Sequence, residues 1–488
     1  MITELSDKQQ IAYNKYLEGK NIFITGPGGC GKTALIKQIQ CHAKANIIDL
    51  QVCALTGCAA VLLECKARTI HSWSGIGLAH GSNDAIIEKI KKSYFKKKVW
   101  LETDILVVDE VSMMSQRIFE LLDLIGKTIR KNTLPFGGIQ VIFSGDFYQL
   151  PPVGTKDDPS SINFCFESPL WYTTFPIENH IVLDKIFRQS EAVYSKLLNQ
   201  IREGVVKKSS IALLENYVNR KVEDELIIKP TKLFPIRIKV DQINSYEMNK
   251  LKTESKLYSI KNEYNLQMTE KEKKIRAMFA DEAIDLELKY IQSNLLCEHN
   301  ITLKIGCQVM CIINFELPNC EMIYNGSQGI ITSFTKEGYP TVKFTSGHEL
   351  IMEPHIWKSE SIPGIGVSQI PLILSWALTI HKIQGQSLDY GEIDIGSTIF
   401  ECGQTYVALS RVKSLEGLYL ASFDAKRIRI NKKVQEFYEV LEEQEEKRRS
   451  EEENKRKEIE LLPEAYVTAA TAQEIPLAIA ELVEEDYN

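Results

Sequence analysis

Short apolar runs alternate with stretches of helical periodicity over the first third of the chain. The runs predict buried strands, because strands that are covered on both faces carry few polar positions. Four such runs are residues 21–25, 51–55, 105–108 and 139–143. Residues 6–18 predict a helix with Ser6 as its N-cap and Gly19 as its stop, and residues 34–41 have apolar side chains at helical spacing. This alternation predicts an α/β domain.

The pattern becomes more charged in the middle of the chain. Residues 231–238 and 240–251 predict a strand followed by a helix. Residues 252–297 are highly charged, and within them a possible capping box at Thr269 and Glu272 and an apolar face predict a long helix. The apolar face of this helix would contain Ile275, Met278, Phe279, Leu286 and Tyr290.

Residues 301–358 break into short β-rich runs at turn signals such as Asn325-Gly326, which predicts a small barrel. Apolar strands are predicted again at 371–378 and 417–421. An amphipathic helix follows Ile430 and passes into a mixed-charge run that predicts a solvated helix or disorder.

A glycine-rich segment separates the first predicted strand from the helix at 34–41. It consists of Gly26, Pro27, Gly28, Gly29, Cys30, Gly31, Lys32 and Thr33. In such a loop the backbone N–H groups can wrap phosphates, Lys32 can reach the β and γ phosphates, and Thr33 can hold Mg²⁺. A glycine-rich turn without a ligand is the alternative, but the position between strand and helix favours a phosphate site.

Two carboxylates follow the buried run at 105–108. Asp109 can anchor Mg²⁺ and Glu110 can orient or deprotonate the attacking water, which are the two acidic functions that a nucleoside triphosphatase needs. A third predicted strand ends before residues 144–152, at the edge where open α/β sheets place ligands.

The net charge of −7 is distributed unevenly over the 488 residues. Residues 442–488 contain 15 acidic and 6 basic residues, a net charge of −9, which leaves +2 for residues 1–441. The near-neutral body permits phosphate binding. Residues 86–98 contain six lysines, which predicts either a solvated helix face or an element that tracks or splits nucleic-acid strands.

Eleven cysteines at irregular spacings and no signal peptide predict a reducing compartment. The densest group lacks a paired C-x-x-C, so a zinc site is disfavoured; it comprises Cys297, Cys307, Cys311 and Cys320. No apolar run is long enough to span a membrane.

Taken in order, the motifs resemble those of superfamily 1 helicases that move 5′ to 3′, most closely the petite-integration-frequency (PIF) helicases, which are relatives of RecD. The resemblance extends from Leu5 to about Phe423. Besides the phosphate loop and Asp109-Glu110, it rests on Leu5-Ser6-x-x-Gln9, Glu110-Val111-Ser112-Met113-Met114, Gly145-Asp146-x-x-Gln149-Leu150-Pro151-Pro152, Phe187-Arg188-Gln189 and Ala408-Leu409-Ser410-Arg411.

The resemblance implies roles for further residues. Gln9 would bind adenine, Gln149 would sense the γ-phosphate, and Arg188 and Arg411 would reach the nucleotide across a cleft, with Gly385 also at the nucleotide. Strand-gripping residues would be Thr56, Gly57, His71 and Trp73 on the first domain, and Thr379, His381 and Lys382 on the second.

The resemblance also implies the fold: two RecA-like α/β domains with parallel sheets, a helical or β wedge insertion and a small SH3-like β-barrel insertion. We expect the first RecA-like domain at 1–183 with the wedge at 75–100, and the second at 184–251 and 368–430. The remaining ranges would be a charged helical insertion at 252–300, the barrel at 301–367, and a charged helix with an acidic tail at 431–488.

The two distant arginines are consistent with a second domain that closes over ATP and Mg²⁺, because they could offset charge on the transferring phosphoryl group. We therefore expect an ATP-dependent DNA helicase that moves 5′ to 3′ on single-stranded DNA and unwinds tailed or forked duplexes in replication, repair or recombination. The alternative is an ATP-gated nucleic-acid clamp or recruiting switch without strand separation. An RNA helicase is disfavoured because Asp109-Glu110-Val111-Ser112 differs from D-E-A-D, and a nuclease would need another acidic metal site.

The chain starts directly at the adenine motif, without a transit or secretory peptide, so we expect an intracellular protein of the cytoplasm, the nucleus or a viral replication site, and no membrane partner. We also expect a monomer. The acidic tail could bind a protein partner, although a solubilising or disordered tail is favoured. Residues 252–297 have no evident counterpart in the family core.

Overall fold

The structure is a computed structural model that describes residues 5–460 except 64, 66, 78, 80, 155–157, 190, 223–225, 318–321, 360–361 and 397. One compact unit ends at Val434, and a second begins at Gln435. The predicted acidic tail lies mostly outside the described residues.

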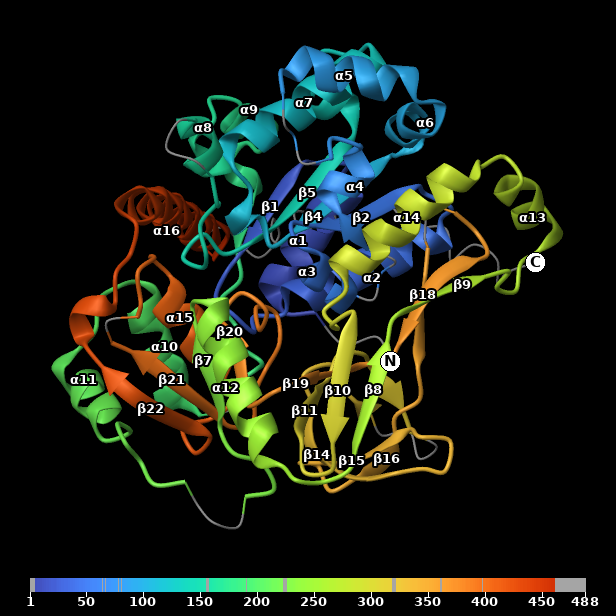
Figure 1. Cartoon of the computed structure of the whole chain (residues 1–488). Helices are drawn as coiled ribbons and strands as arrows, with labels where there is room; N and C mark the ends of the chain where they lie inside the picture. Colours follow the sequence, from blue (N-terminus) through green and yellow to red (C-terminus); the bar gives the residue numbers. More distant parts are fainter. Residues whose placement is uncertain are drawn as a thin grey trace, which may run out of the picture. The chain divides into compact units, whose positions relative to one another are not determined.

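A six-stranded parallel sheet forms the centre of the N-terminal part (Figure 1). Its strands, in spatial order, are β3 (Arg68–Thr69), β2 (Leu50–Ala54), β4 (Ile105–Asp109), β5 (Gln140–Gly145), β1 (Ile22–Thr25) and β6 (His180–Val182). β1 and β4 are buried along their whole length, in keeping with their continuous apolar sequence. The four strands predicted from apolar runs are therefore confirmed.

Helices cover both faces of this sheet. They include α1 (Asp7–Leu17), α2 (Lys32–Ala45), α3 (Gly57–Leu63), α4 (Ile70–Ser74), α7 (Gln116–Arg130), α8 (Pro159–Ile162) and α9 (Trp171–Thr174). The predicted N-cap of α1 is confirmed: the Ser6 side chain accepts from Gln9 N, and Gln9 Oε1 accepts from Ser6 N, which forms a complete capping box.

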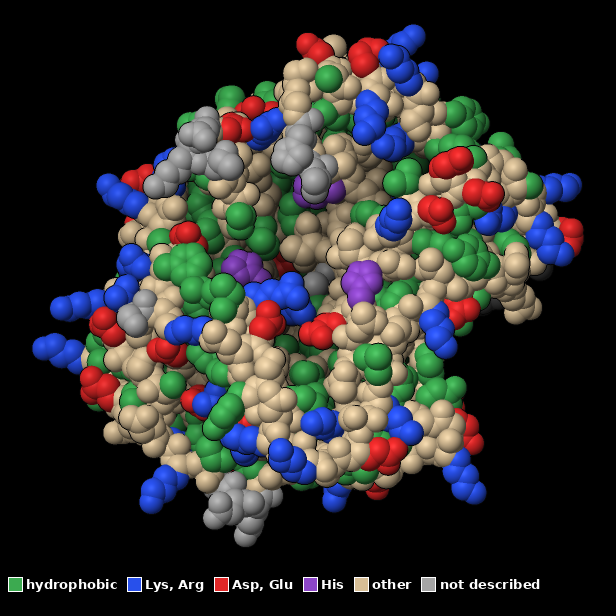
Figure 2. Space-filling model, viewed as in Figure 1, with side chains coloured by type: hydrophobic (Ala, Val, Ile, Leu, Met, Phe, Trp, Pro, Cys, Tyr) green, Lys and Arg blue, Asp and Glu red, His purple; other side chains and the backbone are tan. Residues whose placement is uncertain are grey.

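The lysine-rich stretch forms two helices, α5 (Asn83–Lys92) and α6 (Tyr94–Glu102). Ile86, Ile87 and Ile90 are buried, and most of the lysines are exposed. Blue side chains gather over these two helices in Figure 2. The lysines of this stretch therefore form a solvated helix face, as one of the two interpretations predicted. A role in separating strands stays a prediction.

A second parallel sheet lies in the later part of the chain, with four strands in the order β20 (Ala377–Thr379), β7 (Thr231–Phe234), β21 (Gly391–Ile395) and β22 (Leu418–Phe423). Its helices are α10 (Ala192–Arg202), α11 (Lys208–Glu215), α12 (Arg237–Lys250) and α15 (Gln404–Leu409). The predicted α/β fold with two parallel sheets is confirmed. The domain boundaries themselves stay a prediction.

Between α14 (Asp281–Asn294) and the last strands of the second sheet, the chain is rich in antiparallel strands. Five strands form one sheet in the order β16 (Glu349–Ile351), β15 (Pro340–Phe344), β14 (Gln328–Phe334), β11 (Gln308–Cys311) and β19 (Leu372–Leu374). Shorter pairings add β10 (Asn300–Lys304), β12 (Phe315–Glu316), β13 (Met322–Ile323), β17 (His355–Lys358) and β18 (Ile365–Gln369). The β-rich character is confirmed, and an SH3-like barrel stays a prediction.

The prediction of one long helix within 252–297 is wrong. The range begins with two strands, β8 (Ser255–Ser259) and β9 (Lys261–Tyr264), and then forms two helices, α13 (Glu270–Arg276) and α14 (Asp281–Asn294). The capping box at Thr269 is present, but the chain leaves helical geometry and reaches an extended Ala280. Met278 and Leu286 are exposed, whereas Ile284 and Leu288 are the buried residues of α14.

The single strand predicted at 371–378 is also wrong in its extent. β19 joins the antiparallel sheet and β20 joins the second parallel sheet, with Ser375 and Trp376 between them. A continuous apolar run cannot reveal this division, because both strands are buried.

After the second sheet, α16 (Lys432–Glu460) is helical for 29 residues, so the mixed-charge run is a helix up to Glu460. Among the described residues, no helix has the length and apolar character needed to cross a membrane.

Candidate nucleotide site and nucleic-acid interface

The phosphate loop connects the C-terminal end of β1 to the N-terminus of α2. Gly31 precedes the helix in a left-handed conformation with φ of 86°. A Cβ added to Gly29 would lie 2.5 Å from Arg188 Cβ, and one added to Gly31 would lie 2.5 Å from Gln9 Nε2. These glycines therefore allow two other segments to approach the loop closely.

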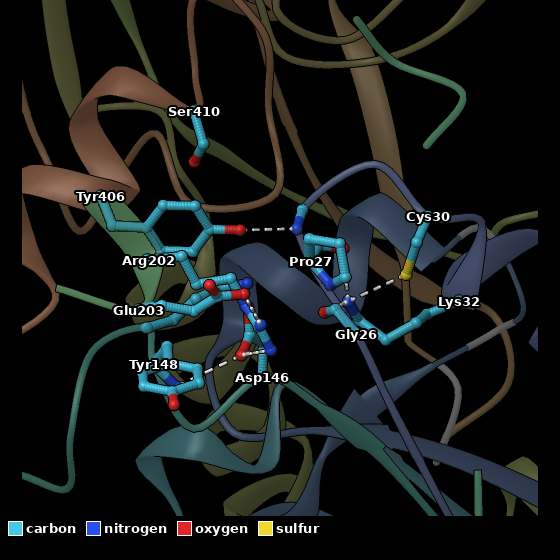
Figure 3. Close-up of polar contacts among 12 residues, drawn as sticks. Gly26, Pro27, Cys30, Lys32, Asp146, Tyr148, Arg202, Glu203, Tyr406 and Ser410 are labelled. Carbon is cyan, nitrogen blue, oxygen red and sulfur yellow. Dashed lines mark hydrogen bonds and ion pairs between the residues drawn. The ribbon is translucent and has the colours of Figure 1, made fainter. Parts of the chain in front are cut away.

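Lys32 lies back over this loop (Figure 3). Its Nζ donates to Gly26 O at 2.7 Å and to Pro27 O at 3.2 Å, and it lies 3.6 Å from Cys30 Sγ. The ammonium group is thus held at the centre of the loop by uncharged acceptors. Thr33 occupies the first turn of α2 and is exposed.

Gln9 reaches the same loop from the capping box of α1. Its Nε2 donates to Gly31 O at 3.1 Å, while its Oε1 accepts from Ser6 N at 2.9 Å. Both ends of the buried amide are therefore engaged by the protein. Recognition of an adenine edge would have to exchange one of these bonds, so this role for Gln9 stays a prediction.

Asp109 and Glu110 end β4 beside the loop. Burial and the neighbouring charge of Glu110 raise the pKa of Asp109 to about 6, although hydrogen bonds from Ser144 and from the Glu110 backbone and the charge of Lys32 oppose the rise. A buried carboxyl group beside a cation is a fitting ligand for Mg²⁺. Glu110 has a left-handed backbone with φ of 56°, which is uncommon for a residue with a side chain.

Gln149 follows β5 and meets a residue from the second sheet. Gln384 Nε2 donates to Glu110 Oε2 at 3.2 Å and lies 3.4 Å from Gln149 Oε1. Gln384 thereby links the two residues predicted to position water and to sense phosphate. Gln384 was not predicted from the sequence, and the place of its neighbour Gly385 at the nucleotide stays a prediction.

Arg188 and Arg411 both lie at the phosphate loop. Arg188 meets Gly29, and a Cβ added to Gly28 would lie 3.6 Å from Arg411 Nη2. Burial lowers the pKa of Arg411, Arg188 lowers it further, and Glu110 raises it. The three charged groups are therefore near one another: the buried Arg411, the partly buried Arg188 and the carboxylate of Glu110.

Tyr406 and Arg202 make further contacts between the two sheets (Figure 3). Gly28 N donates to the Tyr406 hydroxyl at 2.8 Å. Arg202, at the end of α10, forms a bidentate ion pair with buried Asp146, both distances being 2.9 Å, and it also covers the Tyr148 ring. Neither Tyr406 nor Arg202 was predicted. Tyr406 lies just before the quoted motif at Ala408, which was a possible signal, whereas Arg202 lies beside no quoted motif.

The residues at the loop fit a bound nucleoside triphosphate. Gln189 is buried beside Gly29, and neither its Nε2 nor its Oε1 has a hydrogen-bond partner. A buried amide without partners is costly, so this side chain is suited to a polar ligand at the loop. The glycine loop, Lys32 and two arginines supply donors for phosphate oxygens.

The predicted strand-gripping residues fall into two groups. Thr56 and Gly57 lie at the start of α3 and His71 in α4, where burial lowers the pKa of His71. Thr379, His381 and Lys382 line one cavity of about 230 Å³ at the end of β20. The structure thus gathers the second group at a single surface depression.

Trp73, another of the predicted strand-gripping residues, lies in the interior of the protein. Its indole is 1% exposed and packs against Trp100 with ring centroids 4.5 Å apart, so it cannot stack on a base from this position. The aromatic pair instead joins α4 to α6. The sequence could not separate a surface tryptophan from one buried by a neighbouring insertion.

Within the described residues, no group of three or more His, Cys, Asp or Glu side chains could hold a metal ion. Cys297, Cys307 and Cys311 are buried free thiols, and Cys320 lies outside the described residues. The predicted Mg²⁺ ligands Thr33 and Asp109 would act together with phosphate oxygens, as is usual for Mg²⁺ in nucleotide sites.

Comparison with known proteins gives matches over most of the chain. Residues 4–211 match the family described as PIF1-like helicase. The ATP-dependent DNA helicase PIF1 of Emericella nidulans is 32% identical over 481 residues, which cover 86% of this chain and 61% of that protein. The chain spans 61–65% of the length of this and the next three curated relatives.

Solved structures match over a similar extent. The crystal structure of the Pif1 helicase from Candida albicans is 32% identical and has a TM-score of 0.70. The match includes 90% of this chain and 100% of the Candida albicans chain. A Bacteroides Pif1 structure in complex with ADP-AlF4 is 26% identical with a TM-score of 0.72; 91% of this chain covers 98% of it. The two parallel sheets are thus arranged as in these RecA-like structures.

Proposed function

The chain belongs to the PIF1-like helicase family, and from that premise we propose that it is an ATP-dependent DNA helicase. It moves 5′ to 3′ on single-stranded DNA and unwinds tailed or forked duplexes during replication, repair or recombination. It works inside the cell as a monomer.

One observation carries this proposal: groups from both sheets meet at one phosphate loop. Arg188 and Arg411 lie against Gly29 and Gly28, and Gln384 contacts Glu110. A nucleotide bound there would contact both lobes, so its binding and hydrolysis would change the angle between them.

Residues of this chain then have distinct roles. Lys32 and the loop amides bind phosphate oxygens, while Thr33 and Asp109 hold Mg²⁺. Glu110 orients water for attack and accepts its proton. Gln384 fixes the carboxylate by donating to it and also contacts Gln149. ATP, when bound, supplies the phosphoryl group whose transfer to water drives the cycle.

The arginines supply the charge that the transfer step needs. Arg411 is buried and Arg188 is partly buried, so their positive charge is weakly screened and acts strongly on nearby phosphate oxygens. Because Arg411 comes from the second lobe, this stabilisation is complete only when the lobes are closed.

Movement requires a grip on each lobe. The cavity lined by Thr379, His381 and Lys382 provides one grip, and the segment at Thr56 and Gly57 provides the other. Alternating closure and opening would then shift one grip relative to the other along a strand. Strand binding should weaken as salt rises, because phosphate contacts release counterions.

The decisive experiment compares matched duplexes with a 5′ tail or a 3′ tail, in DNA and RNA versions. We expect ATP-dependent unwinding of the 5′-tailed DNA alone. Unwinding from the 3′ tail would contradict the polarity, and preference for RNA tails would contradict the substrate.

The same assay tests the alternative of an ATP-gated clamp. Hydrolysis that is stimulated by single strands, without unwinding or displacement of a protein from the strand, would support the clamp and contradict the helicase. Lys32→Ala should abolish hydrolysis, and near-normal turnover by this variant would contradict the nucleotide site itself.

A further inference from the structure

A cavity of about 500 Å³ lies beside the predicted first-lobe grip. Four parts of the chain line it: the segment from α3 to α4, the inserted helix α14, the strand β17, and the segments at residues 313–314 and 325. Gly57 and Thr69 represent the first, Tyr290 and Asn294 the second, and Trp357 the third. Residues that are far apart in the sequence therefore meet at this cavity; Thr69 and Tyr290, for example, are 221 positions apart.

Direct contacts hold the wall formed by α14 in place. Thr69 Oγ1 and the Tyr290 hydroxyl are 2.6 Å apart, within hydrogen-bond distance. A Cβ added to Gly57 would lie 2.7 Å from Asn294 O, so α14 approaches the backbone of α3 as closely as a glycine permits. The cavity is thus shaped before any ligand arrives, which lowers the entropy lost on binding.

Trp357 supplies a flat aromatic surface in this cavity. It packs edge to face with His355, with ring centroids 4.8 Å apart. The other four of the chain's five tryptophans are at most 8% exposed, whereas Trp357 is partly exposed. An aromatic ring held on edge by its neighbour and open to a cavity is suited to stack on a planar group.

Polar groups surround this ring. Asn294, Asn314 and Asn325 line the cavity together with Arg68 and Lys358. Asn314 Oδ1 accepts from Asn325 N at 2.6 Å, and Arg68 Nη2 donates to Gln51 Oε1 at 2.8 Å, so these side chains have fixed positions. Side-chain amides can pair with base edges, and the two cations suit a phosphodiester chain.

We propose that this cavity binds a nucleobase of the bound single strand, stacked on Trp357. The inference rests on the proposed function and adds a subsite to its first-lobe grip. The cavity reaches Gly57 and Ser72, which adjoin the predicted gripping residues Thr56 and His71. A strand held by its phosphates at the start of α3 therefore has space for one base between α14 and β17.

Fluorescence of the full-length protein tests the stacking. Oligothymidylate should quench the tryptophan emission, because Trp357 is the tryptophan that the strand can reach. Trp357→Phe should remove this quenching and still bind the strand, since phenylalanine retains a stacking surface. Quenching of the tryptophan emission that persists in Trp357→Phe would overturn the proposal.

Affinity for two strands gives the second measurement. Trp357→Ala should bind oligothymidylate about ten-fold more weakly, which is within the range for loss of one stacked base, and an abasic strand of equal length with unchanged affinity. Tyr172→Ala, an exposed aromatic residue of α9, is the matched control and should bind both strands as the wild type does.

The two proposals fail in different ways. Equal weakening of both strands by Trp357→Ala, or no weakening of either, would overturn the base subsite and leave the helicase standing. A wild-type protein that binds neither strand would overturn both. Circular dichroism of Trp357→Phe and Trp357→Ala against the wild type establishes that the variants are folded.

Discussion

At the scale of single residues, Glu110 combines a charged side chain with an unfavourable backbone. Its left-handed conformation is one that residues other than glycine adopt at a cost of about 1–3 kcal/mol when the surrounding structure enforces it. The carboxylate is also fixed by Gln384 from the opposite lobe. Both features hold the side chain at the end of β4, facing the phosphate loop.

Glu110→Gln should therefore slow ATP hydrolysis by about 10²- to 10⁴-fold, because the amide cannot accept a proton from water. Nucleotide binding should persist, since the loop and Lys32 are unchanged. Single-turnover hydrolysis and equilibrium binding of a fluorescent nucleotide measure the two effects. Hydrolysis at the wild-type rate would show that Glu110 is not the base.

Arg202 and Asp146 form the most deeply buried ion pair between the two sheets among the described residues. Arg202→Met should reduce the free energy of unfolding by about 3–5 kcal/mol, because Asp146 would remain buried without its partner. Adding Asp146→Asn should restore part of this loss.

Urea denaturation of the three proteins measures these differences. Arg237→Ala is the control, because Arg237 is 75% exposed where it pairs with Asp241, and such surface pairs contribute about 0–1 kcal/mol. A loss in Arg202→Met no larger than that of the control would contradict the structural importance of the buried pair.

At the scale of elements, the motifs with fixed spacing were predictable. The phosphate loop, the two acids and the capping box of α1 depend on neighbours within a few residues, and the structure has these local elements. The break between α13 and α14 coincides instead with a distant contact: Phe279 stacks on Phe95 of α6, with ring centroids 4.6 Å apart and ring planes 22° apart.

Long-range packing also explains the other misses. Trp73 is buried because Trp100 of α6 covers it, and Arg202 and Gln384 gain their roles from residues of the other sheet. Apolar periodicity reports that a residue is buried but not which element buries it. Such assignments require the arrangement of elements in space.

Phe279→Ala should loosen α14, because the stack with Phe95 ties the start of this helix to α6. We expect faster amide hydrogen exchange in residues 281–294 and unchanged exchange in α2. Met278→Ala is the matched control: Met278 is adjacent but 65% exposed. Equal exchange in the two variants would show that the aromatic contact does not anchor the helix.

At the scale of the whole catalytic unit, two sheets share one loop, and Arg411 is the second sheet's contribution to its charge. Arg411→Ala should reduce the maximal rate of hydrolysis by about 10³-fold while changing nucleotide affinity much less, because the charge acts mainly during phosphoryl transfer. Steady-state rates at saturating ATP and equilibrium binding distinguish the two effects.

Lys413→Ala is the control for this variant, since Lys413 is a nearby exposed cation that pairs with Asp389. Wild-type rates for Arg411→Ala would contradict hydrolysis shared between lobes. A loss of nucleotide affinity with an unchanged maximal rate would show that Arg411 stabilises bound ATP and the transition state equally.

The hydrogen bond between Thr69 and Tyr290 has a mechanical consequence. Like the stack of Phe279 on Phe95, it attaches the inserted segment to the N-terminal part at a place apart from the phosphate loop. If the second lobe rotates about the phosphate loop, the contact between Thr69 and Tyr290 must shift or come under tension. The inserted helix α14 would therefore transmit a small displacement of the nucleotide's phosphate group to the predicted strand grip on the first lobe.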